Sequence, residues 1–155
     1  VNPAFEVGDL MIIKDHICLF PNPLIGRNID ELGPRFPDMS EAYDHALIKR
    51  AKDIAATASI AVREGCYVGL TGPTLETPAE YNYVRVIGGD AVGMSTVPEV
   101  IAARQMGIPC FAMSVITDMG VKGRIEKTTH EMVQRVAEGA EPKLTRIMKE
   151  LIASC

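Results

Sequence analysis

The chain has 155 residues, of which 47% are hydrophobic and 23% are charged, with a formal net charge of −4 at pH 7. This balance is typical of one globular domain, or of a piece of a larger one, and it excludes a chain that is disordered throughout. The net negative charge argues against binding to nucleic acid or a membrane surface. No apolar run approaches the roughly 20 residues of a membrane-spanning helix.

Cysteine spacing and the first residues bear on location and completeness. The four cysteines are widely spaced and form no Cys-x-x-Cys pair. We therefore expect free thiols in a reducing cytoplasm rather than zinc ligands or disulfides. No positively charged segment precedes an apolar one, so no signal peptide is predicted. The chain begins with Val1 rather than Met, which favours a processed or trimmed chain, or a fragment.

The first part of the chain predicts a strand, a long loop and a helix. Residues 10–13 are a short apolar run after a turn-like Gly-Asp pair, which is typical of a strand. Prolines and glycines interrupt residues 20–40, so an irregular loop is expected there, and loops of this length are usually functional. Ser40 resembles a helix N-cap, and apolar residues at helical spacing predict an amphipathic helix over residues 41–63.

The middle of the chain predicts two more strands with a helix between them. Residues 66–70 are short and mostly apolar, and residues 91–94 form a similar run after a Gly-Gly-Asp turn. Between them, Thr77 is placed as an N-cap and Pro78 as the first helical residue.

The last part of the chain predicts a helix, a strand and two helices. Ser95 or Thr96 is expected to cap a helix that ends near residue 105. Residues 108–116 are a continuous apolar run, typical of a central strand that is buried on both faces. Residues 128–139 and 142–154 then predict two helices that are separated by a glycine and a proline.

Strands that alternate with helices predict an α/β fold with a largely parallel sheet and helices on both faces. Ligands of such sheets bind beyond the carboxyl ends of the strands, so the segments after residues 70, 94 and 116 are the places to search. We treat residues 1–155 as a single domain.

Each of these segments carries polar residues with two open interpretations. Glu76 can accept hydrogen bonds from a ligand, or it can simply favour a helix N-terminus. Ser95 with Thr96 can bind an anion such as phosphate, or can only cap a helix. Asp118 can belong to a site or to a solvated loop, and a lone histidine such as His130 is more often structural. The residues alone predict a small-molecule site and leave its reaction open.

Several motifs together resemble the trimeric purine nucleoside phosphorylases. They are Gly-Pro-Thr-Leu-Glu-Thr-Pro-Ala-Glu at residues 72–80 and Gly-Met-Ser-Thr-Val-Pro-Glu-Val at residues 93–100, with shorter matches at residues 5–9, 15–17 and 35–40. The resemblance runs along essentially the whole chain, in order. The Glu-Thr-x-Ala-Glu run favours these enzymes over their methylthioadenosine-cleaving relatives.

The resemblance implies a fold and a reaction. The fold would be nucleoside phosphorylase-like, with a mixed, largely parallel sheet flanked by helices. The reaction would be the phosphorolysis of inosine or guanosine to a free base and ribose 1-phosphate in purine salvage. It implies a cytoplasmic homotrimer that uses phosphate as co-substrate, needs no metal or organic cofactor, and has no nucleic-acid or membrane partner.

The resemblance also implies roles for individual residues. Glu76 would hold the ring N–H of the purine, and Asp118, with Thr117 beside it, would bind near N7 and the 6-substituent and share a proton with the leaving base. His130, the third catalytic candidate, would bond the 5′-hydroxyl. The remaining substrate-binding candidates are Tyr67 and Met94 along the sugar, Ser95 at phosphate, Leu75 and Val92 flanking the base, and Phe36, which would cap the sugar pocket of a neighbouring subunit.

Two departures from the family pattern keep alternatives open. Members that prefer inosine or guanosine commonly have Asn where this chain has Asp118. An ionised Asp can only accept hydrogen bonds, which favours 6-aminopurines, whereas Glu76 favours 6-oxopurines. The family's chain is also nearly twice as long, and its N-terminal phosphate motifs are absent here, so the sheet is expected to be incomplete at its N-terminal side. The alternatives are a methylthioadenosine or adenosine phosphorylase, and a non-catalytic purine-binding fragment or paralogue.

Overall fold

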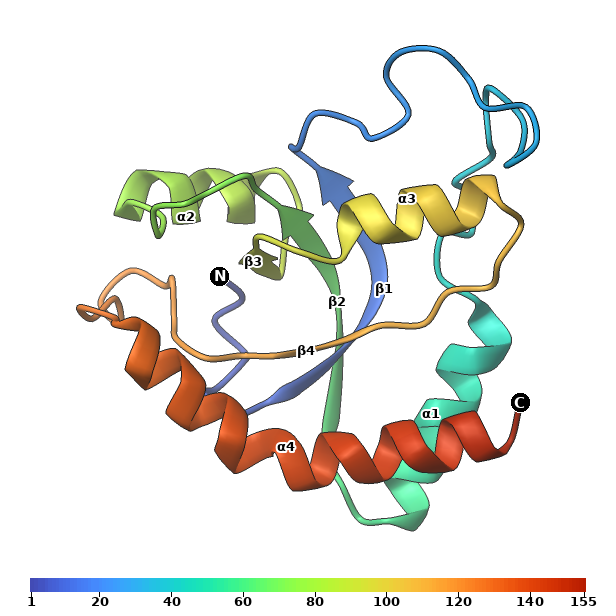
Figure 1. Cartoon of the computed structure of the whole chain (residues 1–155). Coiled ribbons are helices and arrows are strands. Elements are labelled where there is room, and N and C mark those ends of the chain that lie inside the picture. Colours follow the sequence, from blue (N-terminus) through green and yellow to red (C-terminus); the bar gives the residue numbers. More distant parts are fainter.

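A computed structural model describes all residues from Val1 to Cys155. Its four strands form one sheet in the order β3-β2-β1-β4. The β1–β2 and β2–β3 pairs are parallel, and β4 runs antiparallel to β1. The predicted mixed, largely parallel sheet flanked by helices is confirmed (Figure 1). In chain order, the elements are β1 (Leu10–Cys18), α1 (His45–Thr57), β2 (Val62–Gly69), α2 (Pro78–Val86), β3 (Ala91–Gly93), α3 (Val97–Gln105), β4 (Met113–Val115) and α4 (His130–Ala153).

The core is built around β1, which lies between β2 and β4 and is therefore hydrogen-bonded along both edges. Its first residues, from Leu10 to Ile13, are almost completely buried. The helices α1 and α4 pack against each other in the lower part of Figure 1, and α2 and α3 lie on either side of the upper ends of β2 and β1. Burial of this central strand and of the apolar helix faces supplies the main driving force for folding.

The central strand expected over residues 108–116 is wrong. Only Met113–Val115 pair with the sheet, at its edge and antiparallel to β1. Just before them, the Ala112 carbonyl still accepts from the Ile13 N–H of β1 at 3.0 Å. The Cys110 carbonyl instead accepts from the Asp44 N–H at 2.8 Å, outside the sheet. Within this run only Cys110 and Ile116 are buried, and Ile108 is 46% exposed, so apolar character alone does not mark a strand that is buried on both faces.

The helix over residues 41–63 is shorter at both ends than expected. Asp44, not Ser40, is the N-cap of α1, and its side chain accepts from the Leu47 backbone N–H at 2.8 Å. Ser40 Oγ instead donates to Asp38 at 2.7 Å. The helix ends at Thr57 because β2, which starts at Val62, pairs with β1. Long-range strand pairing thus overrides local helix propensity at this end.

The two final helices are one continuous helix, α4, with Pro142 inside it. Proline removes one helical hydrogen bond, at a cost of about 3 kcal/mol, and usually bends a helix. The ribbon of α4 changes direction near its middle in Figure 1. Ala140 before the proline and Ile147 and Leu151 after it are all buried, so packing of one face carries the helix through the break. No helix of the chain is both long and apolar enough to cross a bilayer.

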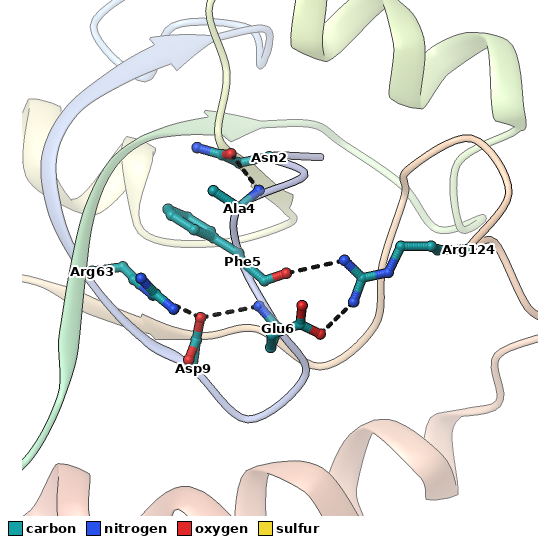
Figure 2. Close-up of polar contacts among 7 residues, drawn as sticks. All are labelled: Asn2, Ala4, Phe5, Glu6, Asp9, Arg63 and Arg124. Atoms are coloured by element: carbon teal, nitrogen blue, oxygen red, sulfur yellow. Dashed lines mark hydrogen bonds and ion pairs between the residues drawn. The ribbon is translucent and has the colours of Figure 1, made fainter.

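The segment before β1 is tied to the rest of the molecule by ion pairs, which Figure 2 shows. Arg63 of β2 pairs with Asp9 at 2.9 Å. Arg124, from the loop after β4, pairs with Glu6 and also donates to the Phe5 carbonyl at 3.4 Å. These contacts anchor the loop that carries the residues following β4.

Candidate active site

One cavity of about 160 Å³ collects side chains from separate segments of the chain. Four of these segments are the loop after β2, β3 with the turn after it, β4 with the loop after it, and α2, and Val1 and Val133 of α4 complete the lining. Among the residues predicted from sequence, the cavity is lined by Leu75, Glu76, Val92, Met94, Thr117 and Asp118.

The carboxyl ends of the parallel strands account for only part of this convergence. Glu76 and Met94 follow the carboxyl ends of the parallel strands β2 and β3, as expected. Asp118 follows β4, which is antiparallel, and Val115 pairs with Leu10 at the start of β1. Asp118 therefore reaches the cavity from the opposite direction, together with β4 residues that also line it. The expectation that all three segments meet at carboxyl ends of parallel strands is wrong for this residue.

The capping geometry of α2 separates the two interpretations of Glu76. Thr77 is the N-cap as predicted, and it forms a capping box with Glu80. The Glu80 backbone N–H donates to Thr77 Oγ1 at 3.3 Å, and Glu80 Oε2 accepts from the Thr77 N–H at 2.7 Å. Glu80 therefore satisfies the helix terminus. Glu76 lies half-buried along the cavity instead.

The polar centre of the cavity consists of two carboxyls and a phenol. Tyr81 Oη donates to Asp118 Oδ2 at 3.3 Å, and Thr117 Oγ1 donates to Asp118 Oδ1 at 2.9 Å. Burial raises the pKa of Glu76, hydrogen bonds oppose that rise, and the nearby Asp118 charge adds to it. Burial, followed by the charges of Asp118 and Glu76, also raises the pKa of Tyr81. The phenol is consequently a hydrogen-bond donor at neutral pH.

Tyr67 and Ser95 lie next to the cavity without lining it. The Tyr67 hydroxyl is 3.5 Å from Ser95 Oγ and accepts from the Ser95 backbone N–H at 3.4 Å. Neither hydroxyl after β3 caps α3: Thr96 holds the N-cap position with no side-chain capping bond, and its φ is 72°. The predicted N-cap position is confirmed for Thr96, but the expected side-chain capping bond is absent. Left-handed backbone is costly for a β-branched residue, and such strain tends to occur at functional sites.

His130 and Phe36 lie outside this cavity. His130 is the exposed first residue of α4, and it is Val133, about one turn later, that lines the cavity. Phe36 is 87% exposed and the Arg35 guanidinium lies 5.8 Å from its ring. It borders a separate hollow of about 600 Å³, together with residues such as His16 and Met39.

Sequence reasoning missed Tyr81, whose hydroxyl is central to the cavity. It lies four residues after Thr77 on α2, and side chains of a helix point back toward the preceding turn. That direction is the signal that could have placed it near the Glu76 loop. No group of three or more His, Cys, Asp or Glu side chains could hold a metal ion.

Comparison with known proteins gives consistent matches. The family described as "Phosphorylase superfamily" matches residues 1–153. Purine nucleoside phosphorylase 1 of Geobacillus stearothermophilus is 50% identical over 153 residues, covering 98% of this chain and 56% of that protein. The enzyme of Rattus norvegicus is 43% identical over 164 residues, covering 99% and 56%. The chain thus spans little more than half the length of these curated relatives.

Solved structures give the same result for the fold. A Schistosoma purine nucleoside phosphorylase in complex with guanosine superposes with a TM-score of 0.93 at 37% identity, covering 97% of this chain and 58% of that one. The Schistosoma mansoni enzyme in complex with adenosine gives a TM-score of 0.88 at 39% identity, covering 97% and 57%.

Proposed function

Because the chain belongs to the phosphorylase superfamily, we propose that it supplies the base and sugar sites of a purine nucleoside phosphorylase. The reaction is cleavage of inosine and guanosine by phosphate to a free base and ribose 1-phosphate, in purine salvage. The observation that carries the proposal is the cavity in which Glu76 and Asp118 lie with apolar residues that suit a flat base.

In this proposal the cavity stabilises charge on the departing purine. The bond between the sugar C1′ and purine N9 breaks, phosphate oxygen bonds to C1′, and the bonding electrons pass to the purine. Glu76 accepts the N1–H of a 6-oxopurine. N7 takes up a proton from solvent as the bond breaks, and the Asp118 carboxylate accepts the hydrogen bond of the resulting N7–H, so that the base leaves neutral. Leu75 and Val92 flank the ring, and Thr117 keeps the Asp118 carboxyl oriented.

The sugar and phosphate are assigned to the groups after β3 and at the start of α4. Met94 and Tyr67 lie along the sugar, Ser95 binds phosphate, and His130 bonds the 5′-hydroxyl. The Tyr67–Ser95 contact at 3.5 Å supports a common sugar and phosphate region. Phosphate is the co-substrate, and we assign no metal or organic cofactor.

We further propose a homotrimer in which Phe36 of one subunit caps the sugar pocket of the next. The 87% exposure of its ring supports a contact outside its own chain. Residues 1–155 are treated as one domain, the C-terminal part of a phosphorylase domain. Its free cysteines fit a reducing cytoplasm, and no nucleic-acid or membrane partner is assigned.

Two alternatives are separated by the same experiment that tests the proposal. The first is a methylthioadenosine or adenosine phosphorylase, because the Asp118 carboxylate suits a 6-amino group. The second is a non-catalytic purine-binding fragment or paralogue.

The test is phosphate-dependent release of hypoxanthine from inosine, with adenosine in parallel and phosphate-free reactions as controls. It uses the purified chain and the same chain preceded by any residues encoded in frame before Val1. Turnover of inosine by either form supports the proposal. Turnover of adenosine alone indicates the adenosine alternative, and purine binding without turnover by both forms indicates the non-catalytic one.

A further inference from the structure

The two carboxyls of the cavity do not by themselves suit a 6-oxopurine. Such a base presents a donor at N1 and an acceptor at O6. Glu76 matches N1–H, but an ionised Asp118 beside O6 places one acceptor against another. A site for 6-oxopurines with this pair therefore requires a neutral donor close to Asp118.

Tyr81 carries such a donor, and this donor contacts Asp118 itself. Its side chain lines the cavity and is only 7% exposed, and its hydroxyl donates to Asp118 Oδ2 at 3.3 Å. The second oxygen of Asp118 is held more closely by Thr117, at 2.9 Å. The longer Tyr81 bond is the weaker of the two, so its hydroxyl is the easier one to redirect.

The position of the Tyr81 ring is fixed by its surroundings. Gly120 lies against the ring so closely that a Cβ at this glycine would come within 3.0 Å of three ring atoms. The ring cannot shift toward that loop, while its hydroxyl can still rotate about the Cζ–Oη bond. The donor is therefore held in place, while its hydroxyl can turn among the nearby acceptors, which are Asp118, Glu76 and the oxygen of a bound base.

We propose that Tyr81 is a specificity-determining residue of the base site: its hydroxyl turns from Asp118 to the 6-oxo oxygen when the base binds. Thr117 continues to hold Asp118, which remains available at N7. This inference rests on the proposed function, because it assigns the base to this cavity. It explains how a site with Asp118 accepts 6-oxopurines, and it leaves 6-aminopurines bonded to Asp118 without help from Tyr81.

The test compares Tyr81→Phe with Tyr83→Phe, a matched change at a tyrosine of the same helix that is 52% exposed. For each protein we would measure kcat/KM for inosine and adenosine, and binding of hypoxanthine and adenine by titration calorimetry. Tyr81→Phe is expected to lower kcat/KM for inosine and affinity for hypoxanthine by roughly tenfold or more, since a buried oxygen loses its donor. Values for adenosine and adenine should change less than about threefold.

A second variant distinguishes specificity from a merely structural role. Asp118→Asn supplies an amide donor directly. Adding Tyr81→Phe to Asp118→Asn should therefore lower kcat/KM for inosine much less than Tyr81→Phe lowers it in the parent protein. The inference would be overturned if Tyr81→Phe lowered kcat/KM and affinity equally for both purines. It would also be overturned if Tyr81→Phe caused the same loss with and without Asp118→Asn. If neither nucleoside turns over but both bases bind, the phosphorolysis proposal fails and the hypoxanthine-to-adenine affinity ratio still decides the role of Tyr81. Failure of the parent protein to bind either base would overturn this inference as well.

Discussion

The base cavity and the loop over residues 19–44 are ordered in opposite ways. In the cavity, segments far apart in the sequence meet through buried contacts, such as that between Tyr81 and Asp118. In the loop, which has no helix or strand, large apolar side chains such as Ile25 and Phe36 are 75% and 87% exposed. Buried contacts between distant segments thus hold the cavity, whereas large apolar side chains of the loop stay exposed.

The loop is held by polar contacts instead of apolar burial. Gln105 of α3, only 8% exposed, donates to Asn28 Oδ1 at 2.9 Å and to the Pro34 carbonyl at 3.2 Å. Arg35 donates to the Leu24 carbonyl at 2.7 Å. These bonds give the loop a defined shape while its apolar side chains stay exposed. Substitutions in the cavity and in the loop can test this difference between buried contacts and polar contacts.

The largest effect is expected at Glu76. Glu76→Ala removes the acceptor for N1–H and should lower kcat/KM for inosine roughly a hundredfold, because a charged hydrogen bond in a half-buried site is lost. Steady-state kinetics check this, with the exposed Glu138→Gln on α4 as control. A loss of less than about threefold would remove Glu76 from the base site.

The next effect concerns packing of the cavity wall. Gly120→Ala places a methyl group against the Tyr81 ring and should destabilise the fold by about 1–3 kcal/mol through overpacking. Urea unfolding measures it. Gly139→Ala is the matched control, because nothing lies within 4 Å of its added Cβ, and it should stabilise α4 by about 0.5–1 kcal/mol. Similar changes in stability for both variants would contradict close packing of Gly120 against the Tyr81 ring.

A substitution that weakens the loop should cause a smaller loss of stability. Gln105→Ala leaves the loop acceptors without their donor and should cost about 1–2 kcal/mol. Proteolytic cleavage within residues 19–44 should also become faster. Unfolding and limited proteolysis check this against Gln134→Ala, an exposed position on α4. Unchanged cleavage would mean that Gln105 does not hold the loop.

A smaller effect follows from the raised pKa of Glu76. A carboxyl whose pKa in the folded state exceeds its ordinary value of 4.5 binds its proton more tightly when folded. Its contribution to stability is therefore full at acidic pH and is lost as pH rises through the folded-state pKa. Glu76→Gln should raise the thermal midpoint relative to the parent near pH 7 and not near pH 4. Equal midpoint differences at both pH values would contradict this.

The smallest effect is expected at Phe36. Phe36→Ala should change the stability of the isolated chain by less than about 0.5 kcal/mol, because the ring makes almost no contact within it. Phe20→Ala, at a ring packed against the core, should cost more than about 1 kcal/mol. Denaturant unfolding compares the two. If copies assemble through Phe36, sedimentation should also show weaker association of the Phe36 variant alone.

Local signals predicted the parts of the fold that depend on neighbours in the sequence. The Thr77–Pro78 start of α2, the irregular loop and the strand–helix alternation are all confirmed. The failures lie where distant segments decide. Pairing with β1 limits α1 and makes β4 a short edge strand, and packing against α1 carries α4 past Pro142.

The sequence by itself determined the α/β class, the family motifs and six of the 16 residues that line the cavity, because short motifs carry their own chemistry and turn geometry. Only the tertiary structure decided that Asp118 arrives from an antiparallel strand and that Tyr81 bonds Asp118. These facts depend on side chains that are distant in sequence and meet only when the sheet and helices pack. No local pattern of residues encodes such a meeting.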